Sequence, residues 1–195
     1  VDSDFYTPDQ HAMVRKIMEG IYSDEWIERV DQQLGDDSGG WDSGSVAIFG
    51  EPGTDQFEFV MTGRHQTIRC DGNTAEHVAF GGPIFYGHDA GGFDEEADHP
   101  GNVYWSQALA ANKLYQMLDG EQQQAALVRQ GLPREQQVGF RSQGYQGIPV
   151  GQLSADQQEH LQGVLKTLVE PYREVDRQEV QDCLQKQGGL QACHL

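Results

Sequence analysis

The chain has 195 residues, and its 31 Asp and Glu against 13 Lys and Arg give a formal net charge of −18 at pH 7. Such a surface repels phosphate groups, so we expect no nucleic-acid partner and no anionic-lipid surface. No apolar run approaches the roughly 20 residues of a membrane helix, so we expect no membrane insertion. The length fits a single domain over residues 1–195.

The start of the chain bears on where the protein works. It begins at Val1 and carries no signal peptide, which is typical of a processed protein or an excised fragment. Together with the acidity, this predicts a secreted, periplasmic or cell-surface protein. Glycine is abundant, with 24 residues, so much of the chain is expected in turns and tight loops.

Two amphipathic helices are predicted within residues 8–34. Thr7 can cap the first, and Gln10 completes a capping box with it. Ser23 precedes the second, whose apolar residues recur at helical spacing. The run Gly-Asp-Asp-Ser-Gly-Gly at 35–40 predicts a loop that ends this helix.

Residues 45–86 have the pattern of a small antiparallel sheet. Strands are predicted at Ser45–Gly50, over the alternating stretch from Gln56 to Cys70, and from Val78 to Phe85. Gly63 interrupts the middle stretch, and a bulge there is favoured because it places the apolar pair after it on the core face. We predict that four residues of this region pack against Trp105 and Leu109: Phe57, Phe59, Ile68 and Phe80.

A long loop is predicted over residues 87–101, followed by helices over residues 102–187. Capping boxes begin two of these helices, at Asp119 and Ser154, and Pro171 kinks or splits the last one. The resulting fold class is α+β, a small antiparallel sheet flanked by N- and C-terminal helices.

Three histidines suggest a metal site. His65 and His88 belong to the sheet region, and His99 precedes a helix, so the three rings are predicted to converge. Asp89 and Asp98 would supply carboxylate support. Imidazole and carboxylate donors suit Zn, Cu or Fe, and an open coordination position would allow hydrolytic or redox chemistry.

Other interpretations of these residues stay open. No pair has a diagnostic spacing such as His-Glu-x-x-His, and histidines in glycine-rich loops also hydrogen-bond the backbone. Four acidic residues of the loop could instead bind calcium through hard oxygen ligands, or favour the dipole of the following helix: Asp94, Glu95, Glu96 and Asp98.

Two further pairs of residues are candidates for chemistry. Arg64 and Arg69 flank His65 and could bind a carboxylate or sulfate, or pair with the acidic loop. Cys183 and Cys193 flank a short glycine-containing loop, so a disulfide between them is expected in an oxidising compartment. The third cysteine, Cys70, is expected as a buried thiol.

Several short motifs resemble a known family. They are Phe49-Gly50-Glu51-Pro52, Gly63-Arg64-His65, Leu118 to Gln122 and Leu153 to Gln157. Over Thr7 to Tyr172 the chain resembles the bacterial domain-of-unknown-function family numbered thirty-five hundred. The resemblance implies an exported protein and gives no activity. In that family a Gly-His-His sequence ends the strand, and Arg64 stands here where it has the first histidine.

Two functions follow from the sequence, and whether the protein is an enzyme stays open. The first is a secreted metal-binding protein, a hydrolase or an oxidoreductase, built on the three histidines. The second is a non-catalytic module of an extracellular assembly. In that case exposed aromatics would form the surface for a protein partner: Trp41, Phe93 and Tyr145.

Overall fold

The computed structural model describes residues 1–72, 76–88, 96–127 and 144–195. Its helices are α1 (Pro8–Ile21), α2 (Asp24–Ser38), α3 (Trp105–Met117), α4 (Gly120–Ala126), α5 (Ala155–Val169) and α6 (Glu174–Lys186). Its strands are β1 (Ser45–Gly50), β2 (Phe57–Gly63), β3 (Gln66–Asp71) and β4 (Phe85–Tyr86), which form one antiparallel sheet in the order β1-β2-β3-β4. The α+β class is confirmed.

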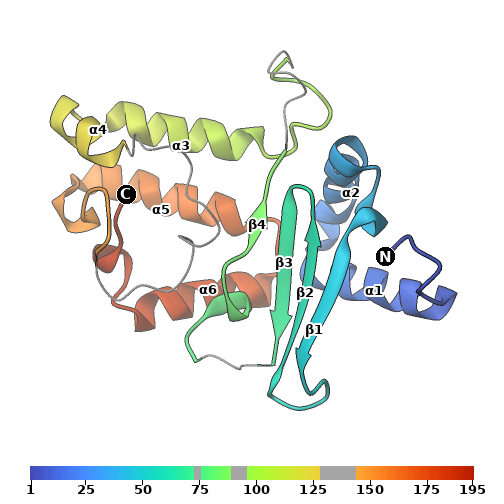
Figure 1. Ribbon diagram of the computed structural model, residues 1–195. Coiled ribbons are helices and arrows are strands. Elements are labelled where there is room, and N and C mark those ends of the chain that lie inside the picture. The colour runs from blue at the N-terminus through green and yellow to red at the C-terminus, as the bar shows by residue number, and fades with distance from the viewer. Residues whose placement is uncertain (73–75, 89–95, 128–143) are drawn as a thin grey trace.

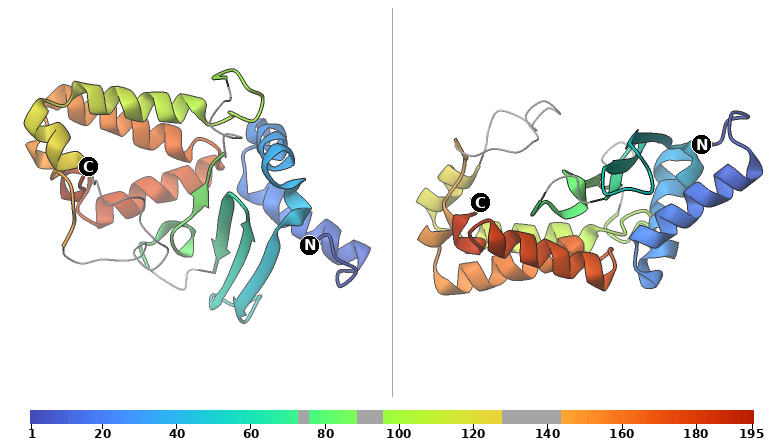
Figure 2. Two further views of the ribbon diagram at one scale, coloured as in Figure 1. Left: turned by 45° about the horizontal axis from the view of Figure 1, so that its top comes forward. Right: turned by 90° about the horizontal axis from the view of Figure 1, so that it is seen from below.

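The sheet stands between two groups of helices. Figure 1 shows α1 and α2 on one side of it and α3 to α6 on the other, and the views in Figure 2 keep the same arrangement. Strand β4 is the sheet edge that faces the second group. None of the helices in the described ranges has the length and hydropathy needed to cross a bilayer.

The predicted capping boxes are present. Thr7 and Gln10 bond each other's backbone amides at the start of α1. Asp119 and Gln122 do the same at the start of α4. These reciprocal bonds satisfy amides that the first turn of a helix leaves open.

The second helix is longer than the sequence predicts, and this correction matters for the site. Helix α2 does not end at Leu34 but continues to Ser38, so the predicted loop is wrong over its first four residues. Gly39 ends it in the left-handed conformation, with φ of 85°, and donates its N–H to the Leu34 carbonyl. The extension places Asp36 and Asp37 in the last turn of α2.

The core face of the sheet is predicted correctly, but the bulge is not. Met61 pairs with Ile68 and Phe59 with Cys70, so these residues share one face. These residues share a face because the chain folds into a β2–β3 hairpin. The hairpin has a tight turn at Arg64 and His65 and is closed by the pair of residues 63 and 66. The single bulged strand is therefore wrong.

The next predicted strand is also mostly wrong. Residues Ala79–Gly81 form a 3₁₀ turn, and only Phe85–Tyr86 pairs with β3. Phe80 adopts a positive φ of 59° in this turn, which is incompatible with a strand.

Two large apolar cores, and a smaller cluster around Trp26 and Tyr104, hold the described part of the chain together. The first lies between the sheet and the N-terminal helices and includes Phe59, Met61 and Ile68, with exposures of 5%, 1% and 0%. The second lies among the C-terminal helices and consists of Leu114, Leu118, Ile148, Val150, Leu153, Leu161 and Val164. The predicted packing of the sheet on Trp105 and Leu109 is wrong, because α3 packs along α5 and leaves these residues 41% and 51% exposed.

Buried tyrosines join the two halves of the fold. Tyr22, at the end of α1, stacks on Tyr172, between α5 and α6, with ring centroids 5.5 Å apart. Tyr86 of β4 contacts Tyr104 at 4.7 Å, just before α3. Trp26 of α2 stacks on Tyr104 in turn. These contacts fix the position of β4 and of the start of α3 relative to α2.

The three cysteines are free thiols, so the expected Cys183–Cys193 disulfide is not formed in the structure. Cys183 lies on α6 against the backbone of Ala79, whereas Cys193 packs on the second core. Their environments differ because Cys193 follows a separate 3₁₀ turn (Leu190–Ala192). Cys70 is half-buried against the first core. Burial raises the pKa of all three thiols, which favours the less reactive protonated form.

Candidate metal centre

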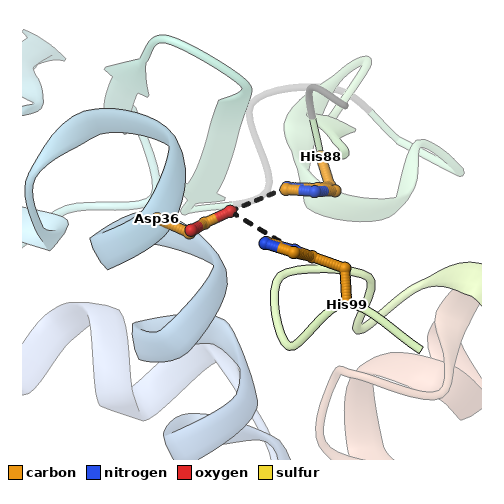
Figure 3. A group of neighbouring side chains, drawn as sticks. All are labelled: Asp36, His88 and His99. Carbon is orange, nitrogen blue, oxygen red and sulfur yellow. Dashed lines mark ion pairs between the residues drawn. The ribbon is translucent and has the colours of Figure 1, made fainter. Parts of the chain in front are cut away.

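Three segments that are far apart in the sequence meet at one point. Asp36 comes from the last turn of α2, His88 follows β4, and His99 lies in the turn before α3 (Figure 3). Each offers one ligand atom, and these atoms all lie within 4.8 Å of one another. Among the described residues, this is the group of His, Cys, Asp and Glu side chains whose spacing suits a metal ion.

Local backbone bonds bring the two histidines to this point. Strand β4 pairs with β3, and the Gly87 N–H then donates to the His65 carbonyl at 3.0 Å, which carries His88 past the β2–β3 turn. On the other side, the Asn102 N–H donates to the His99 carbonyl at 2.9 Å. This turn holds His99 at the entry to α3.

The distances show how an ion would fit. Asp36 Oδ2 lies 3.7 Å from His88 Nδ1 and 3.9 Å from His99 Nδ1, and the two rings stack 5.8 Å apart. Two metal bonds of about 2.1 Å span at most about 4.2 Å, so the two distances to Asp36 already fit, and an ion would have to draw together only a pair that is separated by up to 4.8 Å. The side chains of Asp36 and His99 are 39% and 33% exposed, which leaves them room to move, while that of His88 is 6% exposed.

A second carboxylate lies behind this group. The Asp37 side chain is 2% exposed, and its Oδ1 lies 2.8 Å from His88 Nδ1. Its Oδ2 accepts from Gln33 Nε2 at 2.5 Å and lies 3.2 Å from His65 Nδ1. Both aspartates stand at a helix C-terminus, where the helix dipole disfavours negative charge, so partners that donate protons or carry positive charge are needed there.

Gly101 makes room for the group. Its backbone lies so close that a Cβ added at this position would overlap the Asp36 carboxylate and stand 2.5 Å from His88 Cε1. Its N–H donates to His99 Nδ1 at 3.1 Å. The glycine therefore allows the backbone to approach the candidate ligands and to orient one of them.

The structure brings together two of the three predicted histidines. His88 and His99 belong to the group, whereas His65 lies beside Asp37 and is not one of its members. Asp98 is exposed and is not a member either. Asp89 lies outside the described residues. Metal binding by any of these five residues stays a prediction.

The predicted anion site has partners of its own. Arg69 forms an ion pair with Glu58 and donates its Nε proton to the Pro83 carbonyl at 2.9 Å. Arg64 is exposed in the β2–β3 turn. Binding of a carboxylate or sulfate by these arginines stays a prediction.

The other sequence interpretations are only partly covered by the structure. For calcium, Asp94 and Glu95 lie outside the described residues, and Glu96 is exposed. The interpretation of the histidines as backbone partners applies in part to His99, through its bond with the Gly101 N–H.

The aromatic residues predicted to form a partner surface differ in their exposure. Trp41 is half-buried and packs against His11 and Arg15, with the guanidinium 5.3 Å from its ring, so it is not the exposed aromatic that we expected. Tyr145 is 50% exposed. Phe93 lies outside the described residues, and binding of a protein partner stays a prediction.

Sequence reasoning missed both aspartates of the site. Asp36 and Asp37 occur in a glycine-rich run, and such a run predicts only a loop. The adjacent acidic pair is the signal that was available, since neighbouring carboxylates near predicted histidine ligands would have justified a place in the site.

Comparisons with known proteins define the family. Over residues 2–193 the chain matches the family described as protein of unknown function (DUF3500), and it belongs to that family. Neither curated proteins nor solved structures gave a match to the chain. The geometry of the site is therefore the basis for assigning a function to this chain.

Proposed function

We propose that this protein binds a divalent transition-metal ion between Asp36, His88 and His99. The observation that carries the proposal is the convergence of three ligand atoms within 4.8 Å from three separate segments. The position of Gly101 supports it, because the backbone leaves no space for a side chain beside the group.

The donor set limits the ion and its chemistry. Two imidazoles and one carboxylate suit Zn²⁺ or Fe²⁺, and Cu²⁺ also accepts imidazole ligands. Three protein ligands leave coordination positions for water or substrate. A zinc ion would acidify a bound water for hydrolysis, whereas iron or copper would support redox chemistry. The protein would hold the ion through one buried and two partly exposed side chains.

Titration calorimetry of the metal-free protein with Zn²⁺ tests the proposal. We expect one equivalent to bind, and His99→Gln to weaken binding by more than about 100-fold, since removing a direct ligand costs at least as much as removing its outer partner.

A matched control is available in His11. This histidine stands 3.7 Å from Asp42, as His88 does from Asp36, but no third donor completes a described group there. His11→Gln should bind Zn²⁺ like the wild type. Equal binding by His99→Gln and the wild type would contradict the proposed ligands.

We further propose that the protein works outside the cytoplasm. The net charge of −18 supports this proposal. Fractionation of the source cells with an antibody against the chain tests it, and recovery of the protein only from the cytoplasm would contradict it.

A further inference from the structure

The buried carboxylate of Asp37 has no direct place in the proposed ligand set. Burial and the C-terminal end of the α2 dipole both disfavour its charge. Two nitrogen atoms nevertheless lie within hydrogen-bond distance of it from different elements, Gln33 Nε2 from its own helix and His88 Nδ1 from the segment after β4. Because burying the Asp37 carboxylate here is unfavourable, we looked for a function of this residue in the candidate site.

We infer that Asp37 is a positioning residue that fixes the tautomer and the ring orientation of His88. This inference rests on the proposed metal site. An ionised carboxylate only accepts hydrogen bonds, so at 2.8 Å the shared proton belongs to His88 Nδ1. Nε2 is then the basic nitrogen of the neutral ring and the one left to bind a metal, so an ion would sit on Nε2 and not on the Nδ1 that lies 3.7 Å from Asp36 Oδ2.

The neighbouring histidine, His99, has the opposite tautomer. His99 Nδ1 accepts the Gly101 N–H at 3.1 Å, so in the neutral ring its proton belongs on Nε2, and a metal bound at Nδ1 would replace this hydrogen bond. The two rings therefore differ in which nitrogen is basic, although they stack with an angle of only 14° between their planes. The hydrogen-bond partner of each ring determines which nitrogen carries the proton, and for His88 that partner is Asp37.

Asp37 also holds a second ring near the site. His65 Nδ1 lies 3.2 Å from Oδ2 but off the line of a hydrogen bond, and this atom is buried without a hydrogen-bond partner in the described residues. The same carboxylate thus joins α2 to the β2–β3 turn and to the segment after β4. Its loss should loosen both connections.

The tautomer can be measured without any metal. Long-range proton–nitrogen NMR of the metal-free wild type should show His88 with its proton on Nδ1. In Asp37→Leu, which cannot accept a hydrogen bond, this preference should disappear. A wild-type spectrum with the proton on Nε2 would overturn the inference whether or not the variant folds.

Metal affinity gives the second measurement. We expect Asp37→Leu to bind Zn²⁺ about 10- to 100-fold more weakly than the wild type, as for other partners of metal-bound histidines. The control is Asp31→Leu in the same helix, whose carboxylate pairs with Arg15 at 2.6 Å and not with the site. It should bind Zn²⁺ like the wild type.

The outcomes separate the two proposals. Unchanged affinity in Asp37→Leu would overturn the role of Asp37 while leaving the metal site in place. A wild type that binds no Zn²⁺ would overturn the proposed function and the role of Asp37 in metal binding, and the NMR result would still report on the tautomer.

Discussion

Adding one methyl group at Gly101 should damage the metal site and leave the fold intact. In Gly101→Ala the new Cβ would stand 2.5 Å from His88 Cε1 and would overlap the Asp36 carboxylate. Carbon atoms in contact prefer about 3.5–4.0 Å, so the His88 ring must move by roughly 1 Å, and the Asp36 carboxylate must move as well. Asp36 can move easily because its side chain is 39% exposed, whereas the His88 side chain is 6% exposed and can shift only by disturbing its neighbours.

A shift of this size is large for a metal ligand. Metal–ligand distances tolerate only about 0.2 Å, so we expect Zn²⁺ affinity to fall by about 10- to 100-fold. The free energy of unfolding should fall by about 1–3 kcal/mol, because the added methyl group overpacks the buried His88 ring. Zinc titration by calorimetry measures the first quantity and urea unfolding of the metal-free protein the second.

Gly87→Ala is the matched control. Gly87 directly precedes His88, yet a Cβ there would meet nothing within 4 Å. Its N–H bond to His65 would survive the change. We expect wild-type affinity from this control. Equal affinity of Gly101→Ala and the wild type would refute the argument that the backbone is packed against the ligands.

Three further predictions concern the fold. Phe59→Ala should cost about 3–5 kcal/mol in urea unfolding because the side chain is in the core, and a loss below about 1 kcal/mol would contradict the assigned face. Burial raises the pKa of Tyr86 to about 12, so this phenol ionises at lower pH in the unfolded chain than in the folded protein. The stability that is present below about pH 10 should therefore fall as the pH rises towards 12. Urea unfolding midpoints at a series of pH values would measure this fall. Unchanged midpoints there would contradict the burial of this phenol. Mass spectrometry after alkylation in denaturant without reductant should find Cys70, Cys183 and Cys193 all modified, and a protected pair would show a disulfide.

Much of the fold follows from local sequence patterns. The capping box at Thr7 and the split at Pro171 predicted helix boundaries because their chemistry is local. The core face of the sheet was also predictable, since Ile68 and Cys70 had to join Phe59 and Met61 for the apolar residues to share one side. The packing of α3 was not, because the choice between the sheet and α5 depends on contacts distant in sequence.

Only part of the candidate site was predictable, because its residues also come together through contacts that are distant in sequence. His88 and His99 stood out as histidines around a loop, but their partner Asp36 lies in a stretch with poor helix propensity. Contacts beyond α2 extend the helix there, as the burial of Gln33 and the bond between Asp37 and His88 show. A pairing across such a distance leaves no periodic signal in one sequence.

A crystal grown with Zn²⁺ tests the central claim most directly, through the anomalous difference map at the zinc absorption edge. The account predicts one strong peak bonded at about 2.0–2.2 Å to an oxygen of Asp36 and to one nitrogen each of His88 and His99. No peak between these three side chains, or a peak held by other residues, would contradict it.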